Sequence, residues 1–209
     1  DGKVGIDLPY HAGATYNIEL NGDLKNVSSH LPSPLAKPAG EPLAVNVKVD
    51  GNLNSFELTG QAGADNHFNS RWLLGQKLTL DRAIWAADSK TLPPLPEQSG
   101  VELNMPPMNG AEWLALFQKG AAESVGGAAS FPQHITLRTP MLSLGNQQWN
   151  NLSIVSQPTA NGTLVEAQGR EINATLAMRN NAPWLANIKY LYYNPSVAKT
   201  RGDSTPSSP

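Results

Sequence analysis

The sequence contains no cysteine, which excludes disulfide bonds, thiolate metal sites and cysteine nucleophiles. Only 15% of the residues are charged, whereas about 25% is usual for a globular protein. The net charge of −2 gives no long-range attraction to nucleic acid or to an anionic lipid surface. Apolar runs are short, far below the roughly 20 residues that a membrane-spanning helix needs. These absences leave no sign of a nucleic-acid-binding protein or of a membrane-spanning helix.

Motifs of catalysis and cofactor binding are also missing. There is no G-x-S-x-G nucleophile turn and no phosphate-binding G-x-x-x-x-G-K loop. The four histidines, His11, His30, His67 and His134, lie far apart and lack the spacing of metal ligands. Acidic residues fall mostly at expected turns and on polar strand positions. We therefore expect no catalytic residue, no metal, no cofactor and no enzymatic activity.

The two ends of the sequence differ from its body. The chain opens with DGKVGI, without Met, and closes with the polar stretch TRGDSTPSSP. We interpret residues 1–199 as a section of a longer protein and residues 200–209 as a polar tail or linker that has little apolar surface to bury.

What is present is a repeated alternation of apolar and polar residues. After a proline-rich segment at 31–42, Val45, Val47 and Val49 alternate with polar residues. Strict alternation places one apolar face along a β-strand. The same pattern predicts further strands within 15–22, 54–63, 67–74, 76–85, 100–105, 133–139, 149–157, 170–180 and 188–193.

Turn signals separate several of these expected strands. Asn21-Gly22, Asp50-Gly51 and Asn161-Gly162 supply the positive φ angles of tight hairpins. Short strands joined by hairpins predict a mainly β fold, an antiparallel meander with one apolar face.

One helix is expected to interrupt the strands, at about residues 110–119. Asn109 is a candidate N-cap, and Trp113, Leu116 and Phe117 fall on one side at helical spacing. We expect this short amphipathic helix to pack by its apolar side on one end or wall of the sheet.

Three stretches of the sequence resemble the YhdP branch of the AsmA-like family of bacterial envelope proteins. They are NVSSHLPSPLAKPAGEPLAVNV, ELNMPPMNGAEWLALF, and the region from HITLRTPMLSLGNQQWNNLSI to WLANIKYLYY. Together they cover most of residues 16–193, as hydrophobic patterns with a few Pro, Gly and Trp residues.

The resemblance implies a strongly curved open sheet, a U-shaped groove in which apolar side chains shield phospholipid acyl chains in transit to the outer membrane. It implies a periplasmic section of a protein anchored in the inner membrane, so its partners would be phospholipids and, through the full-length parent, both membranes. No nucleic acid and no other identified envelope protein belongs to this prediction. The residues expected to line the groove are Val45, Val47, Val49, Phe56, Leu58, Ile172, Leu176, Met178, Ile188, Tyr190 and Tyr192.

Two alternatives remain open at this point. A carbohydrate- or protein-binding β-sandwich would cover the apolar faces with a second sheet, and the Tyr190–Tyr193 cluster would then pack inward. A glycosidase on a β scaffold lacks any supporting motif. A sandwich fills its interior with its own side chains, whereas a groove leaves a long apolar surface accessible.

Overall fold

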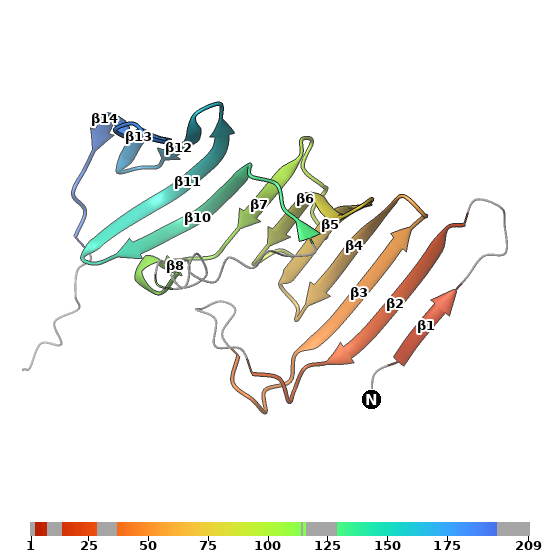
Figure 1. Cartoon of the computed structure of the whole chain (residues 1–209). Coiled ribbons are helices and arrows are strands. Elements are labelled where there is room, and N and C mark those ends of the chain that lie inside the picture. The colour runs from red at the N-terminus through yellow and green to blue at the C-terminus, as the bar shows by residue number, and fades with distance from the viewer. Residues whose placement is uncertain (1–2, 8–13, 29–36, 114, 116–128, 196–209) are drawn as a thin grey trace, which may run out of the picture.

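The computed structural model describes residues 3–7, 14–28, 37–113, 115 and 129–195; side chains are described from residue 14 onward, except that of residue 129. These residues form one mainly β fold, an open and curved mixed sheet that does not close into a barrel (Figure 1). The predicted fold class is thereby confirmed. The expected tail at 200–209 lies outside the described residues.

Twelve strands follow one another across the sheet in the order β1-β2-β3-β4-β5-β6-β7-β10-β11-β12-β13-β14, while the short β8 and β9 pair with β10 and β6. Their bounds are β1 Lys3–Asp7, β2 Tyr16–Asp23, β3 Ala44–Gly51, β4 Ser55–Ala62, β5 Asn66–Leu74, β6 Leu78–Ala86, β7 Gly100–Asn104, β8 Met108–Asn109, β9 Ala129–Ser130, β10 Ile135–Leu144, β11 Gln147–Thr159, β12 Gly162–Gln168, β13 Ile172–Arg179 and β14 Leu185–Leu191.

The sheet is not antiparallel throughout, which corrects the prediction of a simple meander. Strands β1–β6 and β10–β14 are two antiparallel meanders, and β7 lies between them, parallel to both β6 and β10. Parallel neighbours need a crossover connection in place of a hairpin. Residues 87–99 connect β6 to β7. The second connection leaves β7 at Asn104 and reaches β10 at Ile135, and it carries β8 and β9.

Of the three predicted turns, two lie at or beside a hairpin and one does not. Asn161 lies in the tight turn between β11 and β12, where Thr159 pairs with Gly162. Asp50-Gly51 ends β3 just before its hairpin. Asn21-Gly22, however, lies inside β2 and pairs with Asn46 and Val45 of β3, so this turn prediction is wrong. Pairing across the sheet outweighs the local turn preference there.

Residues 110–113 and 115 are helical, and the rest of the expected helix lies outside the described residues. The side chain of Asn109 accepts a hydrogen bond from the backbone N–H of Ala111 at 3.1 Å, as an N-cap does. Trp113 is partly buried. No described helical stretch is long and apolar enough to cross a membrane.

The described residues bury little. No large side chain among them is less than 2% exposed. The apolar residues classed as buried are Leu80, Ile84, Ala86, Met105, Met108 and Leu152. Several lie near the parallel strands β6–β7–β10, so the sheet has a small central core and long, partly exposed wings.

Candidate functional site

Register pairing aligns the alternating apolar residues into rows that run across the strands. Residues that pair across neighbouring strands point to the same face of the sheet. The first apolar row passes through the eleven strands β2–β7 and β10–β14 in this order: Ile18, Val49, Leu58, Ser70, Ala83, Val101, Ile135, Ser156, Val165, Leu176 and Ala186.

The second apolar row lies two residues along each strand, on the same face. It contains no polar side chain and consists of Leu20, Val47, Gly60, Phe68, Trp85, Leu103, Leu137, Ile154, Ala167, Ala174 and Ile188. The alternation that predicted separate strands therefore combines into one apolar face that extends from β2 to β14.

Aromatic rings are concentrated on this face over β4–β6. Phe56 stacks on Trp72 with ring centres 6.1 Å apart, and Phe68 stacks on Trp85 at 5.7 Å. Phe131, from the segment that follows β9, meets Trp72 edge-on at 6.4 Å. Stacked and edge-on pairs of this kind fix the ring positions more firmly than aliphatic contacts do. The middle of the apolar face is therefore aromatic, and its two wings are mostly aliphatic.

Ser70 and Ser156 interrupt the first apolar row. Ser70, in its aromatic middle, adds no free polar group to it. Its hydroxyl donates to the carbonyl of Leu58 at 2.9 Å and accepts from the indole N–H of Trp72 at 3.0 Å. The residue is only 7% exposed. Because its hydrogen bonds are satisfied internally, the surface above Ser70 stays apolar.

The apolar face is only partly covered. Most side chains of the two rows are partly buried, and Leu20 and Ile188, near opposite edges, are 40% and 56% exposed. The described strands all belong to one sheet, and none forms a second sheet packed over this face. This apolar face therefore keeps contact with solvent along its length, where a closed core would be covered by a second layer.

The opposite face of the sheet is polar over β2–β5. Asn46 donates to Glu19 at 3.0 Å and also bonds to Asn21, while Asn17 bonds to Asp50. The hydrogen bond from Asn46, and then the charge of Lys48, lower the pKa of the Glu19 carboxyl. These side chains satisfy one another in contact with water, so this face needs no further partner.

Residues 87–99 cross the polar face at β5 and β6. Asn69 donates to the carbonyl of Pro93 at 3.1 Å, a ring nitrogen of His67 lies 2.8 Å from the carbonyl of Ser89, and Arg82 donates to the carbonyl of Pro96 at 3.1 Å. The crossover connection is therefore attached to the polar face and leaves the apolar face of β5 and β6 free of it.

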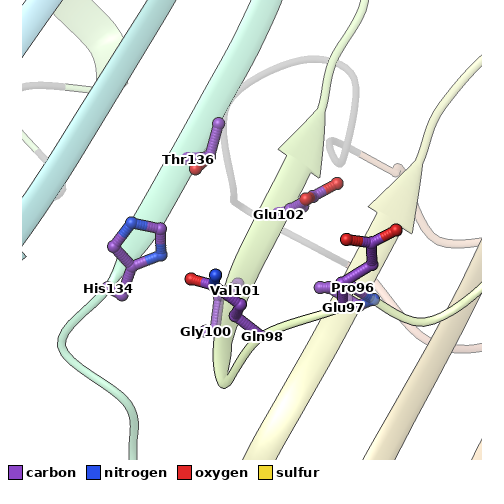
Figure 2. Close-up of a pocket in the computed structure, with 8 residues that line it drawn as sticks. All are labelled: Pro96, Glu97, Gln98, Gly100, Val101, Glu102, His134 and Thr136. Carbon is purple, nitrogen blue, oxygen red and sulfur yellow. The ribbon is translucent and has the colours of Figure 1, made fainter.

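A hollow of about 270 Å³ lies on the polar face where β7 runs beside β10 (Figure 2). Its lining residues are Pro96, Glu97, Gln98, Gly100, Val101, Glu102, His134 and Thr136. Figure 2 shows His134 and Thr136 on β10 and its approach, with Glu97 and Glu102 on the far side. No group of three His, Cys, Asp or Glu side chains in the described part of the chain could hold a metal ion.

Comparison with known protein families decides the relationship of this chain. The sequence matches the family described as YhdP protein over residues 1–209. The chain belongs to the YhdP family. It is thus a bacterial envelope protein of the AsmA-like kind. No solved structure matches it.

The structure of this YhdP-family chain brings most of the predicted groove residues to the apolar face. Val47, Val49, Leu58, Leu176 and Ile188 lie in the two rows. Val45, Phe56, Ile172 and Met178 also lie on this face: Val45 pairs with Ala62, Phe56 with Trp72, Ile172 with Leu191, and Met178 with Thr163. Contact of these residues with lipid stays a prediction.

Tyr190 and Tyr192 do not share the face of Ile188. The register between β13 and β14 shifts at Asn173/Ala174: Ile188 pairs with Ala174, but Tyr190 pairs with Asn173, whose side chain points to the polar face. The Tyr190 hydroxyl donates to the carbonyl of Gly169 at 2.7 Å, and its ring stacks on that of Tyr192 at 5.3 Å. A bulge inserts one residue and so reverses the alternation, which strict counting along the sequence missed.

Other residues of the YhdP-family face were seen as strand residues but not as part of a site. They are Leu20, Phe68, Trp72, Trp85, Leu103, Leu137 and Ile154. Except for Trp85, each belongs to an apolar half of a predicted strand, so the alternation carried the signal. Trp85 lies beyond a register shift at Arg71/Trp72, where two residues of β6 lie opposite one of β5, and counting on from Leu78 and Leu80 places it on the other face. Which halves align depends on the register across two parallel pairings, and the sequence gives no direct sign of that register.

Proposed function

We propose that the apolar face is a section of a lipid path, along which phospholipid acyl chains lie while the molecule carries them through the periplasm to the outer membrane. The observation that carries this proposal is the continuity of the two apolar rows over the eleven strands β2–β7 and β10–β14. Membership of an envelope protein family supports this proposal. The proposal adds an activity, which is lipid transport, a partner, which is phospholipid, and a compartment, which is the periplasm.

The dimensions of the face suit acyl chains. Eleven neighbouring strands, β2–β7 and β10–β14, leave ten gaps, and at about 4.8 Å per gap the rows extend about 50 Å across the sheet. One acyl chain measures about 15 Å, half of the roughly 30 Å hydrocarbon core of a bilayer. The face is thus longer than one lipid tail, as a path requires and a pocket for a single ligand does not.

The area of the two rows alone matches the largest apolar patch of an ordinary soluble monomer, so the length of the face and its further aromatic row carry the argument. Two rows are about 10 Å wide and about 50 Å long, or roughly 500 Å². The largest apolar patch on an ordinary soluble monomer is about 300–600 Å². The aromatic residues Tyr16, Phe56 and Trp72 widen the strip over β2–β5, because they lie on the same face in a further row. Acyl chains would cover this surface, while the polar face remains in water.

The transport role requires no chemical step. The path would lower the cost of moving an acyl chain through water, which is about 0.8 kcal/mol for each CH₂ group kept out of contact with solvent. We accordingly propose a non-enzymatic function in which neither a metal nor another cofactor takes part. The β-sandwich alternative has no support from the described residues, since they form a single sheet.

Native mass spectrometry of the purified chain tests the proposal. Prepared from a bacterial host without detergent, the chain should carry phospholipid adducts, and the delipidated chain should take them up again from phospholipid vesicles. Free fatty acid offered separately shows whether two chains and a headgroup are needed. A folded chain that takes up no phospholipid from either source would contradict the proposed function.

A further inference from the structure

Gly60 occupies an unusual place in the second apolar row. It lies between Val47 and Phe68, two residues before the end of β4, and is buried. Elsewhere along this row every residue carries an apolar side chain. Glycine weakens a strand interior, and where it occurs it often marks the close approach of another group.

The group that approaches Gly60 is the ring of Phe68. A Cβ atom placed on Gly60 would lie 2.3 Å from Cζ and 2.6 Å from Cε1 of that ring. The end of the ring therefore occupies the space that any other side chain at position 60 would need. Phe68 lies over β4 in the direction of Gly60 and does not stand upright between its neighbours.

The ring of Trp85 follows the same orientation. It lies 5.7 Å from the Phe68 ring, and the two planes differ by only 8°. Gly60, Phe68 and Trp85 are consecutive members of the second row. Gly60 and the two rings tilted together over it thus form a low aromatic surface, the Gly60–Phe68–Trp85 floor. Upright rings would instead project from the face.

We infer that Gly60 keeps the lipid path open at β4–β6 by accommodating the Phe68 ring, and that the Gly60–Phe68–Trp85 floor is the place where the path is most easily blocked. This inference rests on the proposed function. A side chain at position 60 raises Phe68 and, with it, Trp85, and the raised rings then occupy the volume through which acyl chains pass.

The test compares Gly60→Ala with a matched control, Gly22→Ala. Gly22 pairs with Val45 and so lies on the same face, and a Cβ atom there would meet nothing within 4 Å. Gly60→Ala should lower phospholipid retention by about threefold or more, equivalent to about 0.7 kcal/mol of binding. Gly22→Ala should retain phospholipid as the unaltered chain does.

The second variant removes the ring that Gly60 accommodates. Phe68→Ala should restore retention in the Gly60→Ala background to the level of Phe68→Ala alone, because no ring is left to raise. If Gly60→Ala retains as much phospholipid as Gly22→Ala does, the inference is wrong even though the path itself stands. If the unaltered chain retains none, the proposed function fails first.

A third measurement avoids substitution, because a Cβ at position 60 would also lie 2.8 Å from the carbonyl oxygen of Asn46 and could impair folding. A phospholipid with a diazirine on its acyl chain is photolysed on the unaltered chain, and the labelled residues are mapped. Phe68 and Trp85 should be labelled together with Val47 and Leu137. Labelling of Val47 and Leu137 alone would overturn the inference.

Discussion

A lysine on the apolar face should be tolerated by the fold and should reduce lipid retention. Val47 and Leu176 are partly buried on β3 and β13. Full burial of an aliphatic side chain contributes about 1.5–3 kcal/mol, so the loss of a partly buried one costs about 1 kcal/mol. The lysine stem can lie along the strand while its ammonium reaches water, and we expect a total loss of about 1–2 kcal/mol.

A closed core would respond differently. An unpaired ammonium without access to water costs several kcal/mol, enough to unfold many domains. Urea denaturation of Val47→Lys and Leu176→Lys therefore separates an open face from a covered one. Phospholipid retention is then measured by mass spectrometry on the same folded samples.

The control is Thr175→Lys, since Thr175 neighbours Leu176 but pairs with Glu166 on the polar face. We expect Val47→Lys and Leu176→Lys to remain folded with less bound phospholipid, and Thr175→Lys to retain it in full. Loss of the fold in both apolar variants, or equal retention in all three, would refute the reasoning.

The remaining predictions concern stability. Glu171 is only 3% exposed and accepts hydrogen bonds from the backbone and side chain of Asn150 at 2.7 Å each and from Asn194 at 3.1 Å. Glu171→Ala should leave these donors unpaired, and we expect urea denaturation to show a loss of about 3 kcal/mol in the free energy of unfolding. Burial raises the pKa of the Glu171 carboxyl, but these hydrogen bonds outweigh burial and hold the pKa below its usual value. The stabilisation by Glu171 is therefore present above the unfolded-state pKa and lost as the pH falls through the folded-state pKa. A Glu171→Gln variant should lack this loss of stability in acid. If its stability falls with pH as that of the unaltered chain does, the role given to Glu171 is wrong. Trp113→Ala should lower the free energy of unfolding by about 2 kcal/mol, less than the 3–5 kcal/mol of a fully buried ring, because Trp113 is partly buried. A loss above about 4 kcal/mol in urea denaturation would show instead that the ring belongs to the core.

Local patterns were enough to predict the β class and most of the apolar face. Val45, Val47 and Val49 alternate without interruption, and the strand that they form pairs in register on both sides. In such a strand the period of two fixes which side chains share a face. The same reasoning applied to Leu176 and Met178 on β13.

Features that depend on distant pairing could not be predicted. The parallel position of β7 depends on where residues 87–99 cross, and that crossing is held by side chains such as Asn69 and Arg82 from other strands. The bulge before Tyr190 appears only when β14 is set against β13. Likewise, the role of Gly60 depends on the ring of a residue in the next strand.

The central claim is that acyl chains lie on one face of this sheet and not on the other. Because the chain has no cysteine, single cysteines can be introduced at Leu58 and Leu176 and, as controls on the polar face, at their neighbours Thr59 and Thr175. Each variant is labelled with a fluorophore and mixed with phospholipid that carries a nitroxide on its acyl chain. The account predicts strong quenching at positions 58 and 176 and little at 59 and 175. Equal quenching at all four positions, or stronger quenching at 59 and 175, would contradict it.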